Sequence, residues 1–402
     1  MKTNSSRIIA LPLLLLCVGA ARSWAQSTNE DKEGLGFVAA QRFRYDSNVF
    51  LLPDSGSNAA TTAAGQRHDV ISTTLLSASY AQRFGLHKLS LGFAPSVVRY
   101  LEFDQFDHFA YNALADWSGL VGSDGRYGLR YERTRAASRL ADQVQAEKNL
   151  VTTDALSADF IVRTGLKWQG VSTWRATRSR NSAVAEQGGD NQGWSGDMGM
   201  RFSPGSGNRS DLRYRRSQYR YSNVIPSQLA DNNYKQDELE LSWLWQVTEP
   251  SRLEGRASYL RRRHDHFHER DFSGFVGKLQ YVWRPTTTTA LTTSMFRELG
   301  AITDASASYA RTYGFGLAPS WQIDPQWSLA ALAEWRYRRY EGYSQIGRPD
   351  DRSLLTGLAT TYKPTELWAL TLGLGEERRR SSDPARTYSA WTASMTARWE
   401  LR

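Results

Sequence analysis

The sequence has 402 residues, a formal net charge of +9 and 40% hydrophobic residues. Its basic residues recur at strand spacing and do not gather in one patch or helix, which argues against a nucleic-acid-binding protein. The single cysteine, Cys17, lies near the start. Disulfides, thiol catalysis and cysteine-based metal sites are therefore excluded from a mature chain that lacks it.

The first residues resemble a secretory signal. Lys2 and Arg7 precede a short apolar run over residues 8–20, and Ser23-Trp24-Ala25 places small residues at the two positions that a signal peptidase requires. The apolar run is too short to span a bilayer. We expect a signal peptide over residues 1–26, cleaved near Ala25-Gln26, and a single domain over residues 27–402.

From residue 35 onward, short runs alternate between apolar and polar residues, which is the period of a β-strand with two different faces. A membrane strand needs only every second residue to be apolar, so a low mean hydropathy does not exclude a barrel. In chain order the runs cover residues 37–45, 70–84, 89–97, 109–117, 126–133, 156–162, 166–174, 194–202, 210–221, 239–247, 253–259, 275–283, 287–297, 313–321, 327–335, 354–362, 368–374 and 391–401.

The connections between these runs alternate between short and long. Short links such as residues 84–86, 248–250 and 363–365 alternate with long polar ones such as 136–149 and 222–233. A membrane barrel has this asymmetry, with tight turns in the periplasm and long loops outside, whereas a soluble sandwich has no reason to keep it in phase. We predict an all-β protein: a transmembrane, antiparallel, up-and-down β-barrel of about 18 strands (16–18) with periplasmic termini.

Two further patterns support this orientation. Tryptophans gather beside the short links, as expected for an aromatic girdle at a membrane surface, although the core of a soluble β-protein is the alternative explanation. Arginines on the apolar faces lie near the long loops, where charge costs little and lipid phosphates are available. The tryptophans are Trp117, Trp168, Trp245, Trp283, Trp321, Trp327 and Trp368, and the arginines are Arg99, Arg261, Arg297, Arg311 and Arg339.

The first strand carries Arg42, Arg44 and Asp46 on one face, which we expect to line a water-filled lumen, and Asp-Ser-Asn is turn chemistry that ends the strand at the outer rim. Residues 44–53, RYDSNVFLLP, together with residues 86–122, resemble the EpsL-like outer-membrane barrels that are encoded with exopolysaccharide biosynthesis systems. That resemblance implies a role in export of a polysaccharide chain across the outer membrane of a Gram-negative bacterium. It brings no catalytic residues and no cofactor.

The partners implied are a polysaccharide chain, outer-membrane lipid or lipopolysaccharide, and periplasmic components of an export system, with no nucleic acid. Two other functions remain open: a passive diffusion porin for small, anionic solutes, and a structural or adhesive barrel. An enzyme is disfavoured, because no nucleophile, base and acid stand out as a set. Genes for glycosyltransferases and a polymerase beside this one would favour export.

The candidate residues of a lumenal path are arginines on the polar parity of their strands. One hypothesis is that they form a basic wall that guides an anionic chain; the alternative is that they pair with acids such as Glu254 and Glu334 and only keep the interior wet. The candidates are Arg42, Arg44, Arg213, Arg215, Arg252, Arg256, Arg262, Arg336 and Arg338.

Three histidines alternate in His264-Asp265-His266-Phe267-His268, which would place their rings on one face if the strand continued. A metal site would use such spacing, but neighbouring arginines disfavour a cation. We expect His264, His266 and His268 at a solvated loop mouth, and no metal.

Overall fold

The computed structural model describes residues 33–54, 66–138, 147–205, 207–221, 233–266, 268, 271–301, 309–341 and 350–401. The expected signal peptide, residues 1–26, lies outside the described residues, and so do most of the long connections 136–149 and 222–233.

Eighteen strands form one sheet. They are longer than the alternating runs, because strand pairing continues into polar residues, mostly toward the long connections; β7 and β13 begin two residues later than expected. The strands are β1 (Gly34–Asp46), β2 (Asp69–Phe84), β3 (His87–Tyr100), β4 (His108–Val121), β5 (Gly125–Ala137), β6 (Leu150–Arg163), β7 (Trp168–Asn181), β8 (Asn191–Gly205), β9 (Asn208–Tyr221), β10 (Tyr234–Thr248), β11 (Ser251–His264), β12 (Phe272–Trp283), β13 (Thr289–Ala301), β14 (Tyr309–Gln322), β15 (Trp327–Glu341), β16 (Asp350–Tyr362), β17 (Trp368–Ser381) and β18 (Tyr388–Leu401).

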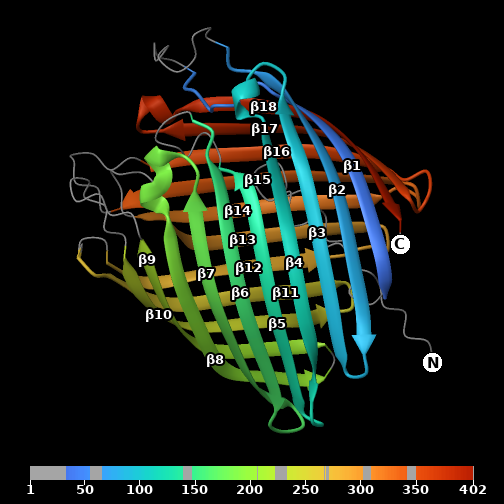
Figure 1. Ribbon diagram of the computed structural model, residues 1–402, viewed down its shortest axis with the longest axis vertical. Coiled ribbons are helices and arrows are strands. Elements are labelled where there is room, and N and C mark those ends of the chain that lie inside the picture. The colour runs from blue at the N-terminus through green and yellow to red at the C-terminus, as the bar shows by residue number, and fades with distance from the viewer. Residues whose placement is uncertain are drawn as a thin grey trace.

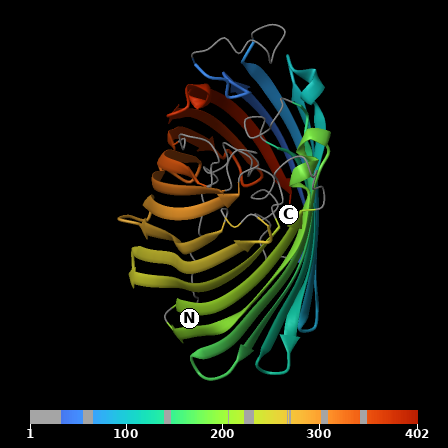
Figure 2. The same cartoon turned by 90° about the vertical axis from the view of Figure 1, so that its left-hand side faces the viewer.

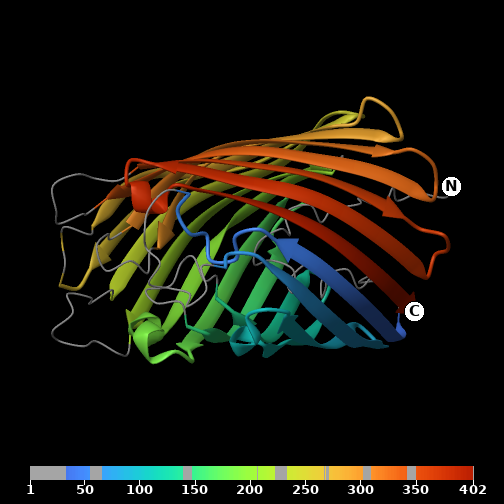
Figure 3. The ribbon, with the colours of Figure 1, turned by 90° about the horizontal axis from the view of Figure 1, so that it is seen from above.

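The sheet is closed. Each strand pairs antiparallel with its neighbours in sequence, and β1 pairs with both β2 and β18, so that no strand has an unpaired edge. Figure 1 and Figure 2 show the strands tilted around the barrel, as closure of a twisted sheet requires. The start of β1 and the end of β18 lie at the same end of the barrel, where Phe37 is opposite Leu401 (Figure 3). The predicted barrel of about 18 strands is confirmed.

The two ends of the barrel differ as predicted. At the end that carries the start of β1, links as short as residues 85–86 and 249–250 join the strands. Gly85 and Gly122 adopt φ of 62° and 64° in two of these turns, a conformation that side chains with a Cβ rarely take. The opposite end carries the longer connections, including the 3-10 turns Asp104–Phe106, Val184–Gly189 and Pro384–Arg386. We call these the turn end and the loop end.

The outward face is apolar and exposed to its surroundings. Residues that are directly opposite in antiparallel strands share a face, so Phe37, Ala78 and Phe93 point outward together. The expected tryptophans stand on this face near the turn end; Trp168 and Trp368 are each about half exposed. Arg99 and Arg261 lie on the same face near the loop end, as predicted. None of the described residues forms a helix that is long and apolar enough to cross a membrane.

A small apolar cluster lies at the loop end, just after β1. The rings of Phe50 and Phe103 meet edge to face with centroids 4.8 Å apart, and Phe106 packs against both. Asn48 closes the loop beneath them, because its amide donates to the Leu52 carbonyl and accepts from the Leu52 N–H, both at 2.9 Å. The Asp-Ser-Asn segment thus ends the first strand at the rim, as predicted.

Candidate solute path along the inner wall

The nine predicted arginines all occupy inward positions of their strands. On β9, for example, Leu212 and Tyr214 face outward and are about half exposed, and Arg213 and Arg215 alternate with them. The other seven follow from the same alternation in their own strands: Arg42, Arg44, Arg252, Arg256, Arg262, Arg336 and Arg338.

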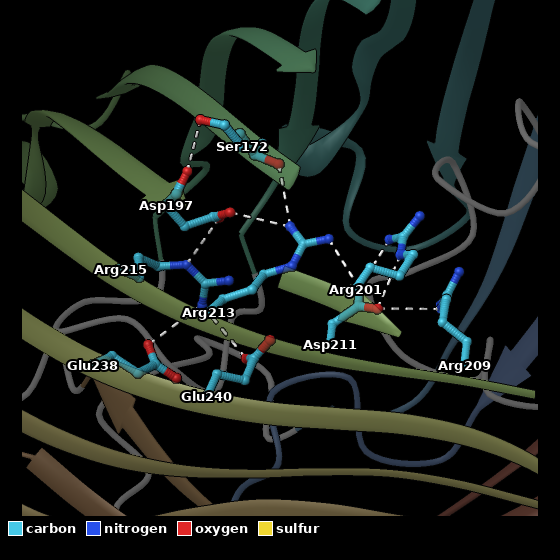
Figure 4. Close-up of polar contacts among 10 residues, drawn as sticks. Ser172, Asp197, Arg201, Arg209, Asp211, Arg213, Arg215, Glu238 and Glu240 are labelled. Carbon is cyan, nitrogen blue, oxygen red and sulfur yellow. Dashed lines mark hydrogen bonds and ion pairs between the residues drawn. The ribbon is translucent and has the colours of Figure 1, made fainter. Parts of the chain in front are cut away.

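Strands β8 and β9 hold the first half of a charge cluster on this wall (Figure 4). Asp211 accepts two hydrogen bonds from Arg201, at 2.9 and 2.8 Å, and one from Arg213 at 3.1 Å. Arg209 lies 3.8 Å from the same carboxylate. The strand register explains the contact between Arg201 and Asp211, because these two residues are directly opposite each other. Arg213 also donates to Asp197 at 3.0 Å.

Strand β10 supplies the second half. Arg215 lies 3.3 Å from Glu238 and 3.6 Å from Glu240, and its Nε is 3.5 Å from Asp197. All three carboxylates are more than 85% buried. We call the set the β8–β10 charge cluster. Its bases are Arg201, Arg209, Arg213 and Arg215, and its acids are Asp197, Asp211, Glu238 and Glu240. Bases and acids are equal in number, so this part of the wall carries little net charge.

Most of the other predicted arginines also have partners. Arg252 pairs with Glu254 and Arg336 with Glu334, which are the acids named from the sequence. The remaining partnerships are Arg44 with Asp46 at 3.5 Å, Arg256 with Glu298 at 3.3 Å, and Arg262, which donates to Gln236 at 3.0 and 2.8 Å and stacks 4.2 Å above the Tyr234 ring. At these positions the geometry favours pairing over an unbalanced basic wall.

A second group of inward bases has no such partner. Within the described ranges, Arg126, Arg175, Lys278 and Arg338 make no ion pair, although all four face the interior. Arg175 is opposite Ser157 on β6 and Ser195 on β8, so serines flank it on both sides. These bases are where the inner wall keeps positive charge.

The three histidines do not form a site. Strand β11 ends at His264, so the alternation that would align the rings stops there. His264 is buried beside Asp271, whereas His268 is mostly exposed, and each ring nitrogen lies 3.6 Å from that carboxylate. His266 is also exposed at the loop end, so the expected solvated position holds for His266 and His268 but not for His264. In the part of the chain that the structure describes, no three His, Cys, Asp or Glu side chains gather as metal ligands would.

The inner wall is hollowed near the turn end. A cavity of about 770 Å³ is lined by residues of β1 to β6 and of the end of β18, and many of its inward residues are small, such as Gly92 and Ser90. Arg130 and Asp116 form an ion pair of 2.9 Å in its wall, and Lys88 also lines it. Small side chains therefore widen the path on this side of the barrel.

Sequence reasoning missed Asp69, which organises the loop end. Its carboxylate is almost fully buried and accepts hydrogen bonds from the backbone N–H groups of Leu101, Glu102 and Phe103, at 3.0, 3.1 and 3.1 Å. These bonds fix the segment that carries Phe103 against Phe50. The only signal in the sequence was an acid at the first inward position of β2, directly after Arg67 and His68.

The apolar outward face, the charged inward face and the closed antiparallel wall define an outer-membrane-type β-barrel of 18 strands. No family model matches the sequence, and no curated protein matches it either. Among solved structures, the chain is similar to the outer membrane protein OpdK of Pseudomonas aeruginosa, with a TM-score of 0.54, 10% identity and coverage of 91% of this chain and 98% of that one.

Two other Pseudomonas aeruginosa proteins are similar to the same degree. For OpdQ the TM-score is 0.53 at 9% identity, covering 91% of this chain and 97% of that one. For OpdO the TM-score is 0.53 at 11% identity, covering 92% of this chain and 97% of that one. At these identities the likeness is one of fold.

Proposed function

We propose that the protein is a passive diffusion channel for small hydrophilic solutes in the outer membrane of a Gram-negative bacterium. The observation that carries the proposal is the contrast between the two faces of a closed wall: ion pairs and unpaired bases inside, apolar side chains outside. Charged groups on an inner wall require water around them, and barrels of 16–18 strands are wide enough to keep an aqueous channel.

This proposal replaces polysaccharide export as the leading function. The export interpretation rests on two segments, residues 44–53 and 86–122, in a chain that no family model matches. The first of these has a structural explanation, because it ends β1 and carries Phe50 into the rim cluster. Similar structures support a channel, and one of them is a structure of OpdK with vanillate, a small carboxylate.

We further propose a weak preference for small anions. In the described strands, the inward bases without an ion pair, including Arg126, Arg175 and Lys278, exceed the inward acids that lack one, which are Asp69, Glu132 and Asp159. Such an excess raises the local concentration of anions and weakens with salt. The balanced β8–β10 charge cluster contributes little to this preference.

Swelling of proteoliposomes tests the proposal. Liposomes that contain the folded protein should swell in isotonic solutions of small neutral sugars, and faster in gluconate than in a cation of similar size. Liposomes with heat-unfolded protein are the control. Absence of swelling with every small solute, together with loss of surface polysaccharide on gene deletion, would return export to first place.

A further inference from the structure

The outer surface of the barrel carries a groove that is separate from the inner path. It has a volume of about 500 Å³ and lies near the loop end, across strands β5 to β9, which stand side by side in Figure 1. Leu156, Ala176 and Trp194 lie on its floor, and Arg178 and Arg220 lie on its edge. All five side chains are on the outward parity of their strands.

The edge toward the loop end is basic. The register places Arg133, Asp154, Arg178, Gln192 and Arg220 in one row across five strands. Arg133 already has partners: it forms an ion pair with Asp154 at 3.6 Å and donates a hydrogen bond to the Tyr111 hydroxyl at 3.1 Å. Arg178 and Arg220 are exposed and make no ion pair with any residue that the structure describes. Two guanidinium groups without an ion pair thus stand at the loop-end margin of the outward face, next to its apolar rows.

The floor, one row nearer the membrane centre, is apolar across β6 to β8 and ends in Gln218 on β9. The Trp194 and Trp174 rings stack with centroids 6.4 Å apart, and Leu156 is half exposed. The side chain between Leu156 and Trp194 is Ala176, and its small size leaves the hollow. Cationic edge and apolar floor therefore follow each other along the membrane normal, in the order in which phosphate and acyl chain follow each other in a lipid leaflet.

We propose that this groove is a binding site for a phosphorylated, acylated glycolipid of the outer leaflet, with the phosphate between Arg178 and Arg220 and an acyl chain along Ala176 and Trp194. The inference rests on the proposed function only in that the barrel stands in an outer membrane; it needs no open channel. Guanidinium groups bind phosphate through paired N–H donors, and they are tolerated on the outer face only near an interface.

Native mass spectrometry of the detergent-solubilised barrel with added lipid A tests the site. The double variant Arg178→Gln/Arg220→Gln should weaken binding of the first lipid A about 30-fold or more, because two charge-assisted contacts are lost. The matched control is Arg263→Gln/Arg380→Gln, which removes two outward arginines near the loop end but outside the groove, and it should bind as the wild type does. Fully dephosphorylated lipid A should bind the wild type as weakly as the double variant.

A second variant examines the floor without changing charge. Ala176→Phe fills the hollow and should weaken lipid A binding about tenfold, while inorganic phosphate, which has no acyl chain, should fail to compete at millimolar concentration. Equal binding by wild type, double variant and control would overturn the proposal, and so would competition by inorganic phosphate alone. The swelling rates of the same variants should equal the wild-type rate, so that failure of this site is distinguishable from failure of the channel.

Discussion

Asp211→Asn is the change that most directly probes the β8–β10 charge cluster. Asp211 is nearly fully buried and accepts from Arg201 and Arg213, with Arg209 close by. The amide keeps the shape of the side chain but removes its charge. The cluster, balanced in the native protein, then holds one positive charge that no acid offsets.

The expected loss of stability in Asp211→Asn follows from how deeply the ion pairs of Asp211 are buried. Removing one partner of a buried ion pair costs about 3–5 kcal/mol, but this wall faces water in our account, and Arg201 and Arg213 keep 13% and 17% of their side-chain surface exposed. We therefore expect a loss of about 1–3 kcal/mol in stability. The uncompensated guanidinium groups should also attract anions into the channel.

The assay is the reversal potential of single channels in planar bilayers under a KCl gradient, with heat-dependent migration in SDS gels as the measure of stability. Asp211→Asn should move the reversal potential toward that of chloride, and the shift should shrink at high salt. Glu249→Gln, which removes the same charge from an exposed turn, is the control and should have a smaller effect. An unchanged reversal potential in a folded Asp211→Asn barrel would refute the placement of the cluster on the conducting wall.

Three further changes test the topology, the loop end and the inner wall. Cysteine at Val184 should react with an impermeant maleimide on intact cells and cysteine at Thr365 should not, because they lie at opposite ends of the barrel; the reverse labelling would invert the topology. Asp69→Ala removes the side-chain acceptor of the Glu102 and Phe103 N–H groups, whereas the Leu101 N–H keeps the Val70 carbonyl. It should cost about 1–3 kcal/mol, seen as proteolysis of that segment, and resistance would contradict its role. Arg175→Glu should shift selectivity toward cations, and no shift would remove Arg175 from the path.

The period of two in the sequence was sufficient to predict the wall and its two faces. Alternation such as that of Leu239, Leu241 and Trp245 assigns every neighbour to the other face, so inward positions such as Arg213 follow from parity alone. The alternation of short and long links then gave the two ends. Asp-Ser-Asn predicted the end of β1, because Asn side chains bond to nearby backbone, as Asn48 does with Leu52.

Partnerships across strands were harder to predict, because they depend on register. Parity shows that Asp197 and Arg215 face inward, but the length of the link between Gly205 and Asn208 and the register shift between Phe202 and Gly205 together decide that they are opposite each other. For the same reason the sequence did not predict the groove on the outer surface. The small side chain of Ala176 leaves a hollow only because the larger side chains of Leu156 and Trp194 are its direct neighbours across the strands. Asp69 was missed because its partners are backbone groups, which no residue pattern reveals.

The ionic current through single purified barrels in a planar bilayer shows whether the protein is an open diffusion channel. We expect a steady open conductance without any added partner and a reversal potential that shows a weak anion preference, decreasing as salt is raised. A folded, inserted barrel that carries no current, or one that prefers cations, would contradict this expectation.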